Sequence, residues 1–564
     1  MGHVDTLNYA DQLASMISAR SESYTTTYSE RNNLLRYIAL VYSEQSRTKE
    51  ACGILALLCK HNPEIASFRR EYAFALNNDS QYELAEIELN KAIRLQPSNA
   101  KSHAQLGRIL CRSGRTNSGY NCYFRAATLE PDNASYTQHL LYWGNYIEQV
   151  TQEDSYRLSL LWASKIHASI SANNQHIRDT APNRQLKLAF VCLDINDPDT
   201  SPFLSPLLSG LDNVDYNITV YNGGIKSGPV STPEWCQQTL VDCSQMNDQE
   251  MANRISTDKI DILVDIDGHS PNNRLGVFAS RPAPVQANWL GYPSTTGLNA
   301  IGYKITDRVI APTDRNQDCF SESLLRLPGG FVCYSPPKDA PEIALNKGHP
   351  NTRFGAFSNL SKVSSLTLDC WAAAILNIPE STLTIIRYEL NNPNVAGLLL
   401  KELARRGVAH DRVILKAPQN KDEQLLDAYN EIDITLDTSP YNNTRTTLES
   451  LWMGVPVISL TGQNPASRMT ASVLSRLNLS GLATQSVFEF AERAKELSEV
   501  KDTLEGLRSS LRNRMQDSAL MNNKQFAREF GNSLRSQWRD WCRTSSNTLD
   551  DQASQAASSA EVDR

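Results

Sequence analysis

Apolar residues follow two different periods along the chain, and the change between them divides it in two. In roughly the first 175 residues, small and large apolar residues recur at the spacing of helices that pack on one another. From about residue 186, short runs rich in β-branched and aliphatic residues alternate with helical stretches. The pattern predicts an all-α region at 1–175 followed by an α/β body.

The helical region carries an internal repeat. Pro63, Pro97 and Pro131 lie 34 residues apart, and each ends a predicted helix because proline cannot continue the hydrogen-bond ladder. Small residues recur in the same register, as at Ala73 and Gly107. A period of 34 residues is typical of the tetratricopeptide repeat, a helix–turn–helix unit whose arrays usually bind proteins. A generic helical bundle with accidental spacing is the weaker alternative.

The α/β body contains two sets of predicted strands. Near-continuous apolar strands between helices indicate parallel sheets that are covered on both faces. The predicted strands are 188–192, 218–221 and 260–265 in the first set, and 383–387, 412–415, 432–436 and 455–460 in the second. We therefore expect two doubly wound domains, 185–340 and 350–543, that face each other across a ligand-binding cleft. The remaining 544–564, rich in Ser, Ala and Asp, is expected to be a disordered tail.

Composition narrows the possible partners. The net charge of −7 argues against a nucleic-acid binder, which needs a cationic surface. No apolar run approaches the length of a membrane span. The eleven cysteines are scattered and include no CxxC pair, which is typical of the reducing cytoplasm and predicts neither a disulfide framework nor a zinc site.

Two segments of the α/β body could carry chemistry, although neither a GxGxxG nor a P-loop motif is present. Asp265 and Asp267 form a DxD at a strand end, which either binds a divalent metal or, as we favour, is an ordinary acidic strand end. The segment 436–452 predicts a strand, a Pro/Asn-rich loop and a helix that begins near Thr446. Its hydroxyls and free N–H groups, with Arg445 and Glu449 beside them, could bind an anion and a ribose, or could simply cap the helix.

Three blocks of sequence together resemble one known family. They are 441–468, which holds YNNTRTTLESLWMGVPVI and Ala-Ser-Arg, then 265–298, and 357–362 (FSNLSK). With the upstream repeats, they resemble the O-GlcNAc transferases and their bacterial relatives, glycosyltransferase family 41, over roughly residues 30–540. The resemblance implies a GT-B fold and a UDP-sugar donor. It also implies inverting transfer of GlcNAc or another hexose to Ser/Thr (in some members Asn) of a protein, without a metal or other cofactor.

The resemblance also assigns roles to residues. Lys362 matches the lysine that neutralises the leaving diphosphate. Arg445 and Thr446 match diphosphate ligands, and Glu449 matches the acidic ligand of the ribose. The positions matched to the donor site as a whole are Asn359, Pro418, Lys421, Gln424, Thr444, Arg445, Thr446 and Glu449, with Pro418 and Lys421 in the loop that contacts uracil.

Departures from the family pattern leave the catalytic base open. The loop 194–201 contains no histidine, whereas relatives usually have a His-Pro pair there. Asp197 or Asp199 could be the base, or could belong to a solvated acidic turn. His269 could be catalytic, or could be a structural histidine bonded to a neighbouring loop. Tyr292 either shapes the acceptor side or packs. In relatives, Gln424 is a histidine, and Thr444–Arg445–Thr446 reads His-Thr-Thr.

Two functions remain open from the sequence. The first is an active cytoplasmic glycosyltransferase whose repeats bind a polypeptide acceptor, by analogy a bacterial surface protein such as flagellin or an adhesin. The second is a non-catalytic relative that acts as a repeat-based binding or partner subunit. Nucleic acid is expected as a partner in neither.

Overall fold

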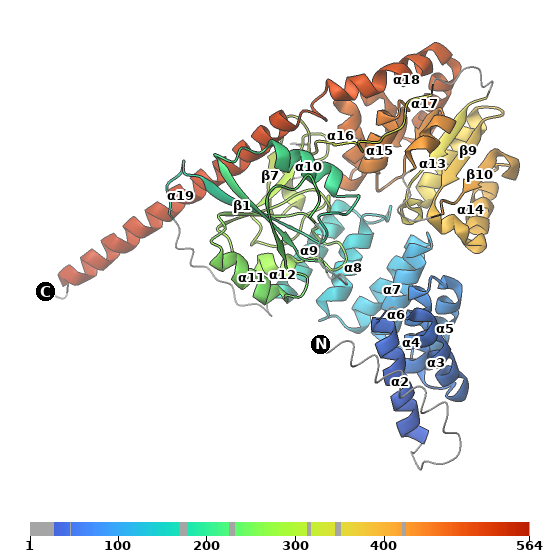
Figure 1. Cartoon of the computed structure of the whole chain (residues 1–564), viewed down its shortest axis with the longest axis horizontal. Helices are drawn as coiled ribbons and strands as arrows, with labels where there is room; N and C mark the ends of the chain where they lie inside the picture. Colours follow the sequence, from blue (N-terminus) through green and yellow to red (C-terminus); the bar gives the residue numbers. More distant parts are fainter. Residues whose placement is uncertain are drawn as a thin grey trace. The chain divides into compact units, whose positions relative to one another are not determined.

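The computed structural model describes residues 28–45, 47–167, 179–224, 232–312, 317–344, 351–419 and 425–562, with side chains over 30–545. The chain divides into two compact units between Leu140 and Leu141, within helix α8 (Ala134–Gly144). Each unit is described by itself below (Figure 1).

The first unit is built from paired helices, as the period of 34 residues predicts. Small residues allow the helices of a pair to approach closely: a Cβ on Gly119 would lie 2.7 Å from the Gly107 carbonyl oxygen. Ala73, Leu76 and Ala85, which the repeat register places at helix contacts, are buried. The helical repeat is therefore confirmed. Its helices are α2 (Tyr28–Glu44), α3 (Thr48–His61), α4 (Ala66–Asn78), α5 (Tyr82–Leu95), α6 (Ala100–Arg112) and α7 (Thr116–Leu129).

Helix α9 (Gln152–His167) belongs to the second unit, although its sequence was expected to end the repeat region at 175. The reason lies in its apolar face. The ring of Trp162 packs edge-on against His269, with 4.5 Å between the ring centroids. Residues 168–178, where the predicted boundary falls, lie outside the described residues.

The first sheet of the second unit is parallel throughout, with strand order β3-β2-β1-β4-β5-β6-β7. The central strands are almost wholly buried, which explains their continuous apolar sequence. The strands are β1 (Leu186–Cys192), β2 (Tyr216–Asn222), β3 (Thr239–Asp242), β4 (Ile262–Asp265), β5 (Val285–Asn288), β6 (Tyr303–Thr306) and β7 (Ser323–Arg326). The intervening helices are α10 (Ser201–Gly210), α11 (Asp248–Thr257) and α12 (Leu275–Ala279).

The second sheet repeats this design with strand order β10-β9-β8-β11-β12-β13. Its strands are β8 (Arg353–Ala356), β9 (Thr382–Ile386), β10 (Val413–Lys416), β11 (Ile434–Leu436), β12 (Val457–Leu460) and β13 (Ala483–Thr484). Its helices are α13 (Ser365–Asn377), α14 (Pro393–Arg405), α15 (Thr444–Trp452), α16 (Met469–Ser475), α17 (Val487–Glu499) and α18 (Lys501–Gln516). Short 3-10 turns η1 (Gln317–Cys319), η2 (Leu360–Lys362), η3 (Tyr388–Asn391), η4 (His410–Arg412), η5 (Leu426–Glu431), η6 (Pro465–Arg468) and η7 (Ser480–Leu482) complete the connections of both domains. The two predicted doubly wound domains are confirmed.

The last helix, α19 (Asn523–Val562), returns to the first sheet domain (Figure 1). Phe526, Phe530 and Trp538 are buried in the core of that domain, where Trp289 packs against Phe530 at 5.1 Å between ring centroids. Residues 523–543 thus complete the first sheet domain rather than the second. The helix also continues to Val562, where the sequence analysis expects disorder from residue 544. No glycine or proline follows Gly531 to end it.

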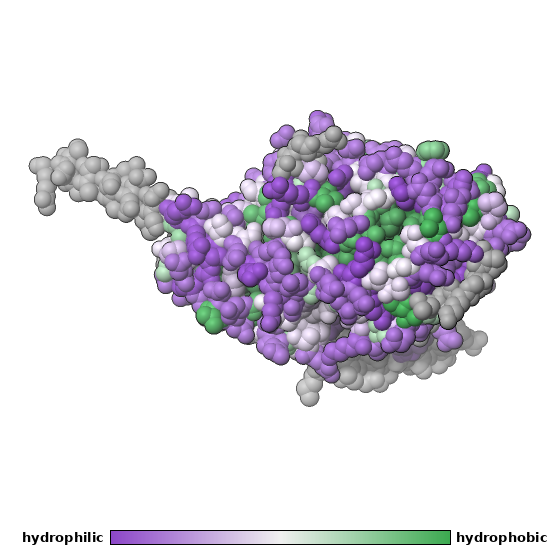
Figure 2. All heavy atoms as spheres, turned by 90° about the horizontal axis from the view of Figure 1, so that it is seen from above, coloured by the Kyte–Doolittle hydropathy of each residue, from purple (hydrophilic) through white to green (hydrophobic). Residues whose placement is uncertain are grey.

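The face of the molecule seen from above in Figure 2 is mostly hydrophilic, with apolar side chains gathered in separate areas. None of the helices in the described ranges is long and apolar enough to cross a bilayer.

Candidate functional site

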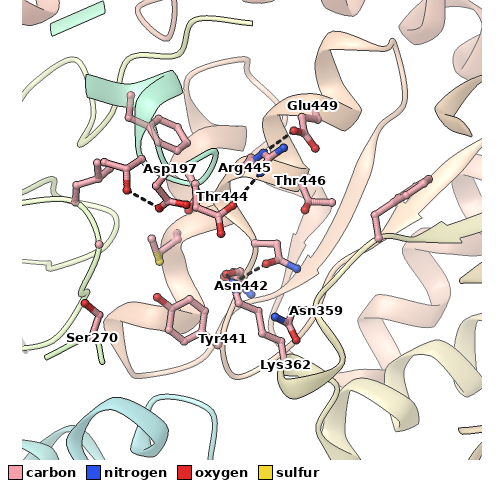
Figure 3. A pocket seen from close by; sticks show the side chains of 18 of the residues that line it. Asp197, Ser270, Asn359, Lys362, Tyr441, Asn442, Thr444, Arg445, Thr446 and Glu449 are labelled. Atoms are coloured by element: carbon pink, nitrogen blue, oxygen red, sulfur yellow. Dashed lines mark hydrogen bonds and ion pairs between the residues drawn. The ribbon is translucent and has the colours of Figure 1, made fainter. Parts of the chain in front are cut away.

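A cavity of about 410 Å³ lies between the two sheet domains, at the carboxyl ends of their strands. In each sheet the order of strands reverses beside the first strand of the domain: β1 lies between β2 and β4, and β8 lies between β9 and β11. Connections diverge at such reversals, which makes them the ligand sites of parallel sheets. The loops after β1, β4, β8, β9 and β11 all reach this cavity, and Figure 3 shows side chains from both domains around it.

Eight of the twelve residues predicted for the site line the cavity. They are Asp197, Asp199, Asn359, Lys362, Thr444, Arg445, Thr446 and Glu449. These residues are far apart in sequence, and the two strand-order reversals bring them together.

The loop 437–443 presents the start of helix α15 to the cavity. The buried carboxylate of Asp437 holds the loop, because it accepts hydrogen bonds from the backbone N–H groups of Thr438 (2.8 Å) and Asn443 (3.2 Å). Its other oxygen accepts from Ser459 and Thr470. Helix α15 therefore begins at Thr444 with its N–H groups at the cavity, where the helix dipole favours an anion.

Lys362 stands beside this helix start, at the end of the 3-10 turn η2 that follows β8. Asn359 caps that turn by accepting from the backbone N–H of Ser361 at 3.1 Å. The Lys362 ammonium donates to the Asn443 side-chain oxygen at 2.6 Å. Burial lowers the pKa of Lys362 to about 8, against the opposing effect of Asp199 and Asp437. The lysine therefore remains a cation at neutral pH.

Arg445 links the two domains across the cavity. Its guanidinium donates to Glu449 at 2.7 Å, one turn along α15, and to Asp199 of the β1–α10 loop at 3.1 Å. Burial raises the pKa of Glu449, while Arg445 acts to lower it. Both acidic partners of Arg445 are thus engaged in ion pairs in this structure.

The two aspartates considered as a base have different surroundings. Asp199 is exposed and pairs with Arg445. Asp197 is partly buried and accepts a hydrogen bond from the Thr200 hydroxyl at 3.0 Å. Burial raises the pKa of Asp197, and the neighbouring charge of Asp199 raises it further. Asp197 is therefore a stronger base than an ordinary aspartate.

The DxD motif serves the fold of the β4 loop. The Asp265 carboxylate accepts from the Gly268 N–H at 2.9 Å and from the Asn288 amide at 2.7 Å. The Asp267 carboxylate accepts from the Leu193 N–H at 2.8 Å. Burial raises the pKa of both groups, that of Asp265 to about 6. The two carboxylates thus hold the loop in place, and Asp265 is buried rather than exposed to solvent as an ordinary acidic strand end would be.

His269 does not line the cavity and lies in the core beside it. The ring is fully buried between Trp162 and Tyr292, and its Nε2 donates to the Thr296 carbonyl oxygen at 2.8 Å. Burial lowers its pKa to about 3, so the ring is neutral. This geometry is that of a structural histidine. Tyr292 likewise packs, with its hydroxyl on the Leu141 carbonyl oxygen at 3.2 Å.

The predicted uracil loop contributes little that can be described. Pro418 follows β10 and accepts from Asn391 through its carbonyl oxygen at 3.1 Å, but it does not line the cavity. Lys421 and Gln424 lie outside the described residues.

Sequence reasoning missed an aromatic wall of the cavity, formed by Tyr142, Tyr146 and Tyr441. The rings of Tyr146 and Tyr441 lie 4.7 Å apart, and the hydroxyls of Tyr142 and Tyr146 are 3.0 Å apart. Tyr142 lies in the last turn of α8 and Tyr146 lies just past its end at Gly144, so the spacing of four residues gave only a weak signal in the sequence. Arg387, after β9, is a further missed cation of the lining.

Taken together, these residues offer positive charge to an anionic ligand on one side of the cavity. Lys362, Arg387 and Arg445 supply three cations, and α15 adds the partial charge of its first turn. The aromatic wall offers an apolar surface next to these charges. A carboxylate with a raised pKa, Asp197, faces the same space.

Comparison with known proteins identifies the relatives of this chain. A model of the family described as Glycosyl transferase family 41 matches residues 148–335 and 348–530. A probable UDP-N-acetylglucosamine--peptide N-acetylglucosaminyltransferase SPINDLY of Petunia hybrida is 32% identical over 424 residues, which are 73% of this chain and 45% of that protein. Its namesake from Oryza sativa subsp. japonica is 32% identical over 430 residues, with 74% and 46% covered. The chain thus spans about half the length of these curated relatives.

A solved structure matches almost the whole chain. A mutant O-GlcNAc transferase of Thermobaculum terrenum superposes with a TM-score of 0.83 at 29% identity, over 93% of this chain and 100% of that one. The match covers helical repeats and both sheet domains, so the expected GT-B architecture is confirmed. From the family match over both sheet domains and this shared fold, we conclude that the chain belongs to glycosyltransferase family 41.

Proposed function

We propose that this chain is an inverting protein glycosyltransferase that moves GlcNAc or another hexose from a UDP-sugar to Ser or Thr side chains of a protein. One observation carries the proposal: Lys362, Arg445 and the start of α15 converge on one cavity at the strand-order reversals of both sheets. The names of the relatives, which specify a UDP-N-acetylglucosamine donor and a peptide acceptor, support this choice of substrates.

The chemistry follows from where charge develops. The acceptor hydroxyl oxygen attacks the anomeric carbon while the bond from that carbon to the β-phosphate oxygen breaks, so that configuration inverts and UDP leaves. Negative charge grows on the β-phosphate. Lys362 and the N–H groups of α15 lie where they can stabilise that charge. Glu449 would accept from the ribose hydroxyls.

Asp197 is the group that would take the proton from the acceptor hydroxyl. Its raised pKa makes it a stronger base than an ordinary aspartate, and it faces the cavity from the opposite domain. Asp199 is less suited, since its carboxylate is paired with Arg445. We assign His269 no role in the proton transfer, because burial lowers its pKa to about 3, which makes it a weak base, and because it does not line the cavity.

We also propose that no metal or other cofactor takes part. The cations Lys362 and Arg445 with the helix dipole supply the positive charge that a divalent ion provides in other transferases. Transfer in excess chelator at an unchanged rate is the expected result. A loss of transfer that only added Mg²⁺ or Mn²⁺ restores would refute this part of the proposal.

The acceptor is proposed to be a polypeptide that the helical repeats bind, because solenoids offer extended binding surfaces. A bacterial flagellin or adhesin is one acceptor to test. All eleven cysteines are free, which fits the proposed cytoplasmic location.

A donor screen tests the function. The purified chain is incubated with UDP-GlcNAc, UDP-glucose and other nucleotide sugars, with and without cell lysate, while UDP release and intact protein masses are followed. We expect lysate-dependent UDP release and a hexose-type mass gain on an acceptor protein. If neither UDP release nor a mass gain is seen with any donor, the proposal is wrong.

A non-catalytic partner subunit is the second candidate, and one specific observation favours it. The loop 194–201 lacks histidine, and its Asp199 forms an ion pair with Arg445 across the cavity. Calorimetry with UDP tests whether the chain is a pure scaffold without a donor site. Micromolar binding that Lys421→Ala abolishes would argue for a working donor site.

A further inference from the structure

Three consecutive residues of the loop before α15 hold the Lys362 ammonium. The ring of Tyr441 lies under it, with 4.2 Å between Nζ and the ring centroid. The Asn442 carbonyl oxygen accepts from it at 3.3 Å, and the Asn443 side-chain oxygen accepts at 2.6 Å. A lysine side chain has four rotatable bonds, so an ammonium without such contacts would sample many positions.

These three residues are themselves fixed in place. The Asn443 amide nitrogen donates to the Ser358 hydroxyl, which follows β8, and both residues are buried. The Tyr441 ring also packs against Tyr146 at 4.7 Å between centroids. At the other end of the loop, the Ser439 carbonyl oxygen accepts from Ser364 at 2.6 Å. The contacts with Lys362 are therefore made by a rigid loop.

The number of N–H groups on the ammonium determines how many hydrogen bonds remain for a ligand. An ammonium has three N–H groups. Asn442 and Asn443 accept two of them from the α15 side. The remaining N–H is then left for a group in the cavity, which Lys362 lines.

We propose that Asn443 and Tyr441 are positioning residues for Lys362, which fix its ammonium so that one N–H points at the diphosphate of the donor. The proposal rests on the proposed function, because it supplies the reason why a fixed ammonium matters. A donor group that is already in place when charge develops costs no reorganisation in the transition state. The effect should therefore appear in the rate of transfer rather than in the affinity for the donor.

Other charged groups also act on Lys362 and must stay constant in a test. Asp199 and Asp437 favour the protonated ammonium, and Arg387 disfavours it. None of these three is altered in the variants below. The Tyr441 hydroxyl can be removed separately from the ring, because the ammonium contacts the ring face.

Two matched pairs of variants test the proposal. Asn443→Ala removes the acceptor, while Asn443→Asp keeps an oxygen there and adds charge. Tyr441→Leu removes the ring face, while Tyr441→Phe keeps it. The first readout is competitive acetylation of Lys362 with trace acetic anhydride at a series of pH values, followed by peptide mass spectrometry. It reports the Lys362 pKa in the free protein and needs no donor.

We expect the Lys362 pKa, about 8 in the parent chain, to fall in Asn443→Ala and Tyr441→Leu, to rise in Asn443→Asp and to stay in Tyr441→Phe. The second readout is kinetics with the active donor. In Asn443→Ala and Tyr441→Leu, kcat should fall about tenfold with KM for the donor within about twofold. The loss of kcat in Tyr441→Phe should be smaller than that in Tyr441→Leu, because the ring face remains.

An unchanged Lys362 titration in folded Asn443→Ala and Tyr441→Leu would overturn the proposal, as would a loss confined to KM. If Asn443→Ala does not fold, the two Tyr441 variants decide alone. If the parent chain transfers no sugar at all, the proposed function fails, and the acetylation series still shows whether these residues hold the ammonium.

Discussion

The two sheet domains repeat one architecture, yet they present opposite charges to the cavity between them. Among the described residues of its lining, the first sheet domain contributes the carboxylates Asp197, Asp199 and Asp267 and no Lys or Arg. The second contributes Lys362, Arg387 and Arg445, with one carboxylate, Glu449, paired to Arg445. The same strand-order reversal thus serves two chemistries.

This difference in charge indicates a separate role for each sheet domain. The basic domain also directs the start of α15 at the cavity, so it is built to bind and stabilise an anion. The acidic domain holds Asp197, whose pKa burial raises and which we propose as the base. A transfer reaction needs both, at one reacting carbon. The whole-chain charge of −7 shows neither role, because each depends on a few local groups.

The largest effect is expected from the basic domain. Lys362→Ala should lower the transfer rate about 100-fold or more, because it removes a cation that stabilises the leaving phosphate. UDP affinity, measured by calorimetry, should weaken much less. Lys401→Ala, at an exposed position of α14, is the matched control and should change neither quantity. Equal losses in rate and in affinity would mean that Lys362 only binds the donor.

Asp197→Asn should come next, from the acidic domain. We expect transfer to fall about 100-fold with UDP binding unchanged, since the variant loses the base but no donor contact. Asp197 must be ionised to act, so the rate of the parent chain should fall as pH drops through its raised pKa. Lys362 must be protonated, so the rate should also fall as pH rises through about 8.

The two limbs of this pH profile therefore report the two domains separately. In Asp197→Asn, the remaining transfer rate should no longer fall at low pH, whereas its fall at high pH should persist. If the acid limb persists unchanged in Asp197→Asn, another group is the base and the division of work proposed here is wrong.

A smaller effect is expected where the two domains touch. Asp199→Asn breaks the ion pair with Arg445 and frees the guanidinium for the diphosphate. Because an ion pair this exposed is worth only about 0.2–1 kcal/mol, UDP affinity should rise by no more than about fivefold. The gain should shrink as salt is raised, since exposed charges are screened. A weaker affinity for UDP in calorimetry would instead make Asp199 a donor-binding group.

The sequence predicts the order and type of the domains better than the boundaries between them. The helical repeat and the long apolar strands carry strong periodic signals, and they form as expected. Strand β8, with the sequence RFGA, was not predicted because Arg353 and Gly355 interrupt its apolar run, although Lys362 follows it. The return of α19 to the first sheet domain could not be foreseen either, since an amphipathic helix does not specify which core it covers.

Prediction of the site from the sequence has the same limits. The segment 437–449 predicts its own helix start and its anion site, because both depend on local sequence. Its contacts with Asp199 and Lys362 depend on folding, over separations of 246 and 81 residues. His269 follows a strand end, as catalytic histidines often do. Only its burial against Trp162 shows that it belongs to the core.

The smallest effect on transfer is expected from His269, which lies next to the acidic side of the cavity without lining it. His269→Ala should lower stability by roughly 2–4 kcal/mol, because it leaves a void beside Trp162 and Tyr292. At a temperature where the variant is folded, transfer should stay within about twofold of the parent. Thermal unfolding and kinetics on the same samples separate stability from transfer rate. A 100-fold loss of rate in a folded variant would mean that His269 is a catalytic residue.

The pH dependence of stability gives an independent check on the same residue. The pKa of His269 is about 3 in the fold and 6.5 for an unperturbed histidine, so the unfolded chain binds the additional proton between these values. The neutral ring therefore contributes its full stability above about pH 6.5, and that contribution is lost as pH falls toward 3. In His269→Ala, the midpoint of urea unfolding should decline less steeply over this window than in the parent chain. Equal slopes would mean that the ring is protonated in the fold, and a protonated ring could not remain buried between Trp162 and Tyr292 as the structure has it.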